Sequence, residues 1–225
     1  MVKEMRIYLV RHGRQNSSLC NVDVPLAEEG RRQACLVGKR LASYQIDAVY
    51  SSDLIRARET AEIIREELIK SDKNTSFSRE EQIKVRKELR EIDFGDLEGM
   101  SDAEIKGKYK EFFAERDLLI DDLAFPGGEC GRDVIKRVTK VLDEQKVSGY
   151  ENIVVVTHGG TIRSILTKFL QMHPANKLLF SLTLENTSIT EIFYSMEKDR
   201  YYVERVNDYA HLEGEEDLLR RNWVR

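Results

Sequence analysis

Short apolar runs alternate along the chain with longer stretches in which apolar residues recur every three or four positions. The short runs predict strands at residues 6–10, 46–50, 83–85 and 153–156. The longer stretches predict helices at residues 28–43, from residue 54 onward, at 129–146 and at 161–172. Two late apolar segments, 188–194 and 201–206, lie close enough in sequence to pair antiparallel.

Alternation of strands and helices predicts an α/β fold built around a mostly parallel sheet. We expect a three-layer sandwich over residues 1–225, with helices on both faces of the sheet and one antiparallel edge strand. Ser52 or Asp53 is expected to cap the second helix. Residues 101–125 have dense mixed charge and an irregular helical pattern, which predicts a helical insertion or lid.

Composition narrows the class of protein. The net charge of −4 over 225 residues, with acidic and basic residues interleaved, argues against a nucleic-acid partner. No window approaches the roughly 20 apolar residues of a membrane span. The three cysteines, Cys20, Cys35 and Cys130, have neither disulfide-framework nor zinc-site spacing. We therefore expect a cytoplasmic protein without a membrane partner.

Three predicted strands run directly into polar residues and glycines. The segments in question are residues 11–13, 51–56 and 157–160. Because ligands of parallel α/β sheets bind beyond the carboxyl ends of the strands, we expect these three segments to share one edge. That edge would carry two arginines, two histidines and several glycines.

The residue types at this edge suit a phosphoryl group. Arg11 and Arg56 each present a planar fork of donors that matches phosphate oxygens. Gly13 and Gly159 allow the backbone to approach an anion closely. Helix N-termini add backbone N–H groups and partial positive charge.

His12 and His158 add chemistry to the anion site. Neighbouring arginines disfavour a further positive charge, so we expect neutral imidazoles. One of them could attack a phosphoryl group, and the other could stabilise its developing negative charge. His173 and His211 lack this context and are expected to be structural. A proton donor is also needed, and composition does not choose among four acidic candidates: Glu91, Asp93, Asp96 and Glu98.

The order of several motifs resembles that of the histidine phosphatase superfamily, which also holds the cofactor-dependent phosphoglycerate mutases. These motifs are "LVRHG", "PLAEEGRRQA", "YSSDLIRARETAEII", "LREIDFGDLEG", "FPGGE" and "VVVTHGGTIR". Later segments, "LENTSIT" and "NDYAHL", are similar to the bacterial phosphatase branch. The resemblance extends from about residue 6 to residue 212.

The resemblance implies roles for five residues. His12 would be the nucleophile that becomes phosphohistidine, and Glu91 would be the acid and later the base. Arg11 and Arg56 would bind the phosphoryl oxygens, and His158 would complete the pocket. The implied substrate contacts are Arg11, Gly13, Asn16, Arg56, His158 and Gly159. No metal or other cofactor is implied.

Departures from the family pattern favour a phosphatase over a mutase. Gln15 and Ser18 stand where the family often has Thr or Ser and then Asn, and Asn16 lies out of register. Mutases carry Tyr at the place of Phe94 and Asn at the place of Gly160. They also carry Lys at residue 102 and an Arg-Arg pair absent from residues 108–122.

The sequence is also compatible with three other functions. The protein could be a phosphoglycerate mutase, a non-catalytic phosphate-binding regulator or a nucleotide-binding α/β module. The last is weakened because no glycine-rich phosphate loop is present. The substrate of a phosphatase could be a sugar phosphate, phosphoglycerate, a phosphate of nucleotide or cobalamin metabolism, or a phosphoprotein. We expect a small phosphorylated metabolite, and the sequence leaves a homodimer open.

Overall fold

The computed structural model describes residues 4–181 and 183–220, and a six-stranded sheet in the order β3-β2-β4-β1-β5-β6 lies at its centre. The strands are β1 (Glu4–Arg11), β2 (Ala48–Ser51), β3 (Lys84–Val85), β4 (Asn152–Thr157), β5 (Ile189–Ser195) and β6 (Arg200–Asp208). β1, β2, β3 and β4 run parallel, whereas β5 pairs antiparallel with both β1 and β6. The sheet is therefore mostly parallel, with its antiparallel pairing at one edge, as the sequence predicted.

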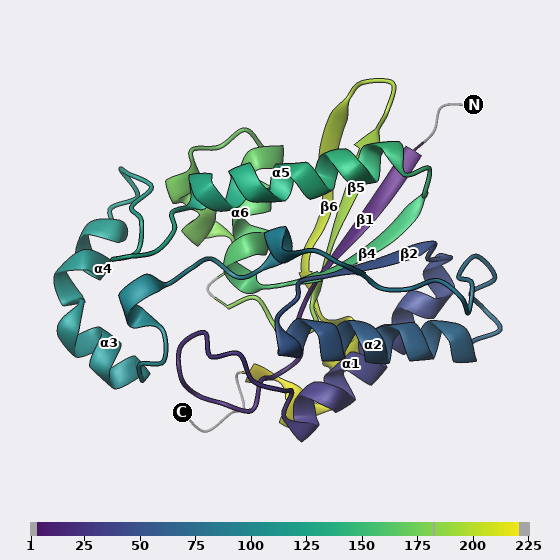
Figure 1. Ribbon diagram of the computed structural model, residues 1–225, viewed down its shortest axis with the longest axis horizontal. Coiled ribbons are helices and arrows are strands. Elements are labelled where there is room, and N and C mark those ends of the chain that lie inside the picture. The colour runs from purple at the N-terminus through teal and green to yellow at the C-terminus, as the bar shows by residue number, and fades with distance from the viewer. Residues whose placement is uncertain (1–3, 182, 221–225) are drawn as a thin grey trace.

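Helices cover both faces of this sheet (Figure 1). α1 (Glu28–Leu41) and α2 (Ile55–Lys70) lie on one face, and α5 (Gly131–Val147) and α6 (Gly159–Phe169) lie on the other. Successive side chains of a strand point to opposite faces. In β1, Tyr8 and Val10 accordingly join the core beneath α1 and α2, and Ile7 and Leu9 join the core beneath α5 and α6. The expected three layers follow from this alternation.

The segment predicted as one irregular helix forms two short helices at one side of the sheet (Figure 1). They are α3 (Asp102–Lys108) and α4 (Lys110–Arg116), and neither contains a buried residue. The chain breaks between them at Tyr109, whose φ of −115° departs from helical geometry. Ser101 and Glu104 form a capping box at the start of α3.

The predicted cap of α2 is wrong. Neither Ser52 nor Asp53 occupies the cap position, which is Leu54. The Asp23 carboxylate instead accepts the backbone N–H of Ile55 at 2.8 Å. Asp53 pairs with the Arg90 guanidinium at 2.7 Å and so is unavailable to the helix. The first turn of α2 is therefore satisfied by a residue about 30 positions upstream, which local sequence does not reveal.

Short 3₁₀ segments connect the main elements. They span Ala42–Tyr44, Lys87–Leu89, Gly95–Leu97, Pro174–Leu179, Ala210–Leu212 and Glu216–Leu218. Among residues 4–181 and 183–220, no helix combines the length and apolar character that crossing a membrane requires.

Candidate active site

The carboxyl ends of β1, β2 and β4 meet at one edge of the sheet. In the strand register, Arg11 lies beside Thr157 and Ser51 lies beside Val156. The backbone N–H of His12 donates to the carbonyl of Thr157 at 2.9 Å. The three polar segments that follow these strands are thereby brought together, although they are separated by up to about 145 residues along the chain.

His12 and His158 lie side by side in the interior. Their ring centroids are 5.0 Å apart, and the two residues are 4% and 0% exposed. Burial lowers the pKa of both imidazoles well below the usual value, and the positive charge of Arg56 lowers both further. Both rings are therefore neutral at neutral pH, as the sequence predicted.

The hydrogen bonds of His12 fix which of its nitrogen atoms is basic. Nδ1 lies 2.7 Å from the carbonyl oxygen of Gly13, and because a carbonyl can only accept, Nδ1 carries the proton. Nε2 therefore keeps its lone pair and accepts a hydrogen bond from Nε of Arg56 at 3.3 Å. This arrangement presents Nε2 as a nucleophile next to a cation.

Arg56 is almost completely buried in the first turn of α2. Its guanidinium donates to the Val22 carbonyl at 3.1 Å and to Oδ1 of Asn21 at 2.6 Å. The Asn21 amide in turn donates to the Glu98 carboxylate at 2.6 Å. The sequence gives no sign of this role for Asn21, because Asn21 lies outside every family motif and contacts Arg56 only in the folded chain.

Arg11 is held at the edge of the same cluster. Its guanidinium donates to the carbonyl oxygen of Leu184, while its Nε is buried without a partner among the described residues. Burial, followed by the charge of Arg220, lowers the pKa of Arg11 to about 9. Arg11 therefore remains a cation at neutral pH. The approach of Arg220 to the site is not visible in the local sequence pattern.

The loop before β5 supports the backbone of this cluster. The Asn186 side chain donates to the carbonyl of His12 at 2.7 Å, and the backbone N–H of Thr187 donates to the carbonyl of Arg11 at 2.9 Å. The "LENTSIT" motif signalled this loop, but no role could be assigned to it before the fold was known.

Glu91 is the acidic candidate that reaches the cluster. Its carboxylate accepts the backbone N–H groups of Gly160 and Thr161 at 3.2 and 3.1 Å, at the N-terminus of α6. A Cβ at residue 160 would lie 2.6 Å from Oε1 of Glu91, so a larger residue there would displace the Glu91 carboxylate from its present position. Asp93 and Asp96 have exposed side chains, and neither forms a hydrogen bond with a described residue of this cluster. Glu91 thus lies at the N-terminus of α6, whose N-cap residue is His158.

Two of the predicted substrate contacts, Gly13 and Asn16, make contacts with other parts of the chain. A Cβ at Gly13 would lie 2.5 Å from the carbonyl oxygen of Gly30, so Gly13 permits close packing on α1. Asn16 is exposed, and its backbone N–H donates to the Pro25 carbonyl at 2.9 Å. The geometry gives no support to Asn16 as a substrate contact, and that assignment stays a prediction. Gly159 lies in the cluster, where a Cβ would be 3.7 Å from Nε of Arg11.

The remaining histidines have structural contacts. The His173 side chain accepts the backbone N–H of Ala175 and caps the following 3₁₀ segment. His211 shares a hydrogen bond of 3.1 Å with the Thr187 hydroxyl. Neither belongs to the cluster of His12 and His158.

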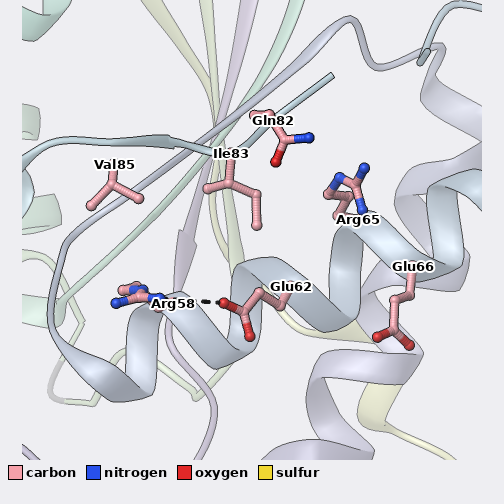
Figure 2. A pocket seen from close by; sticks show the side chains of 7 residues that line it. All are labelled: Arg58, Glu62, Arg65, Glu66, Gln82, Ile83 and Val85. Carbon is pink, nitrogen blue, oxygen red and sulfur yellow. Dashed lines mark ion pairs between the residues drawn. The ribbon is translucent and has the colours of Figure 1, made fainter. Parts of the chain in front are cut away.

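A separate groove of about 370 Å³ lies between α2 and residues 82–85 (Figure 2). It is lined by Arg58, Glu62, Arg65, Glu66, Gln82, Ile83 and Val85. Arg58 and Glu62, which are one helical turn apart on α2, form an ion pair with an N–O distance of 3.7 Å. The lining includes none of the predicted site residues. In the part of the chain that the structure describes, no group of three or more His, Cys, Asp or Glu side chains is arranged to hold a metal ion.

Comparisons with known proteins agree with this geometry. The chain is 34% identical over 220 residues to phosphoglycerate mutase-like protein 4 of Arabidopsis thaliana, covering 92% of this chain and 86% of that protein. It is 32% identical over 215 residues to the metal-independent phosphoserine phosphatase of Arabidopsis thaliana, covering 92% and 82%. A solved mycobacterial glucosyl-3-phosphoglycerate phosphatase matches with a TM-score of 0.77 at 25% identity, covering 92% of this chain and 100% of that one.

A family model matches most of the chain. The model described as the histidine phosphatase superfamily (branch 1) matches residues 7–209, which include every strand-end segment of the cluster. The sequence motifs had indicated the same family, in the same order along the chain. The chain belongs to the histidine phosphatase superfamily.

Proposed function

We propose that this protein is a phosphomonoesterase that hydrolyses a small phosphorylated metabolite through a phosphohistidine intermediate. The observation that carries the proposal is the state of His12. Its imidazole is neutral, its Nδ1 proton is held by Gly13, and its Nε2 lone pair lies beside Arg56 and His158. A buried neutral nucleophile among cations suits attack on an anionic phosphoryl group.

In the first step, Arg11 and Arg56 bind the non-bridging phosphoryl oxygens and Nε2 of His12 attacks phosphorus. The N–P bond forms as the P–O bond to the leaving group breaks. Protonated Glu91 transfers its proton to the departing oxygen, which gives the alcohol. His158 stabilises the charge that develops on the phosphoryl oxygens.

In the second step, a water molecule attacks the phosphohistidine while the Glu91 carboxylate removes a proton from it. The N–P bond breaks, inorganic phosphate forms, and Nε2 of His12 recovers its lone pair. The two guanidiniums supply the positive charge that such a reaction needs, and the proposed reaction uses no metal or other cofactor. Orientation and charge stabilisation provide most of the rate enhancement.

Phosphatase activity is favoured over mutase activity by the surroundings of Phe94. Its ring packs on Phe125 with centroids 4.6 Å apart, where a mutase would offer a tyrosine hydroxyl. Curated relatives at comparable similarity include bisphosphoglycerate-dependent phosphoglycerate mutases as well as phosphatases. We also propose a cytoplasmic location, which the three free cysteines support.

The test is phosphate release from a panel of phosphorylated metabolites, with p-nitrophenyl phosphate as a general substrate and a chelator present throughout. We expect release by the native protein and none by His12→Ala. A parallel reaction contains 3-phosphoglycerate and a bisphosphoglycerate primer. Isomerisation without phosphate release would make the protein a mutase, and phosphate or vanadate binding without turnover of any ester would make it a regulator.

A further inference from the structure

A buried hydrogen bond links the second histidine to a serine that the proposed mechanism does not use. Nε2 of His158 lies 2.9 Å from Oγ of Ser52, and both side chains are 0% exposed. Ser52 follows β2 and His158 follows β4, so the contact crosses between neighbouring strand ends. Which atom donates decides where the proton of His158 lies.

The contacts of the Ser52 hydroxyl identify the donor. A hydroxyl has one hydrogen to donate and two lone pairs. Oγ of Ser52 accepts the backbone N–H of Leu54 at 3.3 Å. Within residues 4–181 and 183–220, the only acceptor that the hydroxyl can reach is Nε2 of His158. A proton on Nε2 would therefore leave two buried groups unsatisfied, the serine hydrogen and the Nδ1 lone pair, whereas a proton on Nδ1 leaves only the Nδ1–H without a partner.

The proton of the neutral His158 ring accordingly belongs on Nδ1. This atom is buried and has no hydrogen-bond partner among the described residues. Nε of Arg11 is a second buried donor without a partner, and it lies 3.7 Å from where a Cβ on Gly159, the next residue, would stand. Two unsatisfied donors beside one glycine indicate an absent acceptor, and a phosphoryl oxygen has the required chemistry.

We infer that Ser52 is a positioning residue, which donates to Nε2 of His158 and so holds the Nδ1–H toward a non-bridging oxygen of the bound phosphoryl group. The identity of that anion rests on the proposed function, whereas the tautomer does not. His12 has its proton on the same atom by a different means, because Gly13 accepts from its Nδ1. The lone pair on Nε2 of His12 thus faces the Arg56 guanidinium, with Nε at 3.3 Å, whereas the lone pair on Nε2 of His158 accepts from Ser52.

The direct test is the histidine tautomer, read by two-bond ¹H–¹⁵N correlation spectra of the full chain labelled with ¹⁵N-histidine. The His158 signals are assigned by their loss in His158→Asn. We expect Nδ1 of His158 to be protonated and Nε2 to be unprotonated near neutral pH. A proton on Nε2 would overturn the inference. The spectrum requires no turnover, so this result stands apart from the success or failure of the proposed function.

Activity of Ser52 variants supplies the second test. Ser52→Ala is expected to lower kcat about 100-fold with little change in KM, because the contact that it weakens strengthens as charge develops on the phosphoryl group. Ser52→Thr keeps the hydroxyl and should recover most of the loss. The matched control is Ser164→Ala, which deletes another buried hydroxyl, one that donates to the Gly160 carbonyl at 2.9 Å within α6. An equal loss of kcat in both alanine variants, at equal thermal stability, would contradict the positioning role.

A double variant separates positioning from structural damage. The side-chain amide of His158→Asn offers an N–H close to where Nδ1 stands and needs no tautomer. Ser52→Ala should therefore cost kcat little further in the His158→Asn background. The same 100-fold loss in that background would overturn the inference.

Discussion

The strand-end pocket and the α3–α4 segment differ in how firmly the fold holds them. In the pocket, the two histidines and Arg56 are buried, and each has hydrogen bonds to backbone or side chains from other elements. In contrast, α3 and α4 contain no buried residue. α4 contacts the core through aromatic side chains, such as Phe112, whose ring centroid is 5.5 Å from that of Phe125.

The α3–α4 segment is nevertheless fixed at its ends. Ser101 caps its start. Beyond its end, the buried Asp122 carboxylate pairs with Lys177 and accepts the backbone N–H groups of Gly131 and Arg132 at 3.0 and 2.8 Å. The segment is thus a loosely packed strap between two firm anchors. From this difference we predict that the chemistry resides at the sheet edge and that the strap affects the choice of substrate.

The largest effect is expected at the pocket nucleophile. His12→Ala should lower kcat at least about 10⁴-fold, because Nε2 of His12 faces Arg56 directly, whereas Nε2 of His158 accepts from Ser52. Steady-state hydrolysis of p-nitrophenyl phosphate measures the loss, and circular dichroism checks the fold. A folded His12→Ala variant with normal turnover would show that the nucleophile lies elsewhere.

Glu91→Gln should have a smaller effect that depends on the leaving group. For alkyl phosphates we expect kcat to fall about 10²- to 10³-fold, because their alkoxides need a proton on departure. For p-nitrophenyl phosphate the first step should be nearly unaffected, since nitrophenolate leaves without help. The comparison is made by the burst of nitrophenol in rapid mixing. Equal loss in the first step with both substrates would exclude Glu91 as the acid.

A change in the strap should alter binding and leave the chemistry intact. Phe112→Ala removes an aromatic contact worth about 0.5–1.5 kcal/mol that holds α4 against Phe125, and the weaker docking of α4 should raise KM for a bulky substrate by at most about 2- to 10-fold. We expect kcat for p-nitrophenyl phosphate to stay within about twofold of the native value. Leu118→Ala is the control, because Leu118 is 64% exposed. A large fall in kcat for Phe112→Ala would erase the distinction between the two regions.

The smallest effect concerns stability against pH. The pKa of His12 is lower in the folded chain than in the unfolded chain, because of burial and the charges of Arg56 and Arg11. Below about pH 6.5 the unfolded chain therefore binds a proton that the folded chain does not, and stability falls as pH falls. The contribution of one such histidine is at most about 1.4 kcal/mol per pH unit.

His12→Ala should accordingly show a shallower decline of the free energy of unfolding between pH 6.5 and pH 5, by about one proton. Urea unfolding in buffers free of phosphate and sulfate measures it, since these anions would bind the folded pocket. Parallel curves for the native and variant proteins would mean that His12 titrates alike in both states.

The sequence predicted the parts of the fold that local pattern determines. Each buried strand was visible as an apolar run, and the polar residues after Val10 and Val156 marked the edge where the site forms. The α3–α4 break was invisible because it depends on the conformation of one residue, Tyr109. Similarly, α6 begins at Gly159 rather than the expected Thr161, since the distant Glu91 carboxylate accepts its first N–H groups.

Residues that support the site were beyond the reach of the sequence for the same reason. Asn21 meets Arg56, and Asn186 meets His12, only through contacts between segments that are 35 and 174 positions apart. Ser52 was expected to cap a helix, and its contact with His158 spans 106 positions. Nothing in the local pattern distinguishes these side chains from ordinary loop polar residues.

The central claim is that Nε2 of His12 accepts the phosphoryl group, and trapping the intermediate tests it most directly. In Glu91→Gln the water step lacks its base, so the intermediate should accumulate with p-nitrophenyl phosphate. Alkaline quench, proteolysis and fragmentation mass spectrometry should then find one phosphoryl group on His12, and ³¹P NMR of the denatured protein should assign it to Nε2. A phosphoryl group on another residue or on Nδ1, or a nitrophenol burst without any phosphorylated protein, would contradict the account.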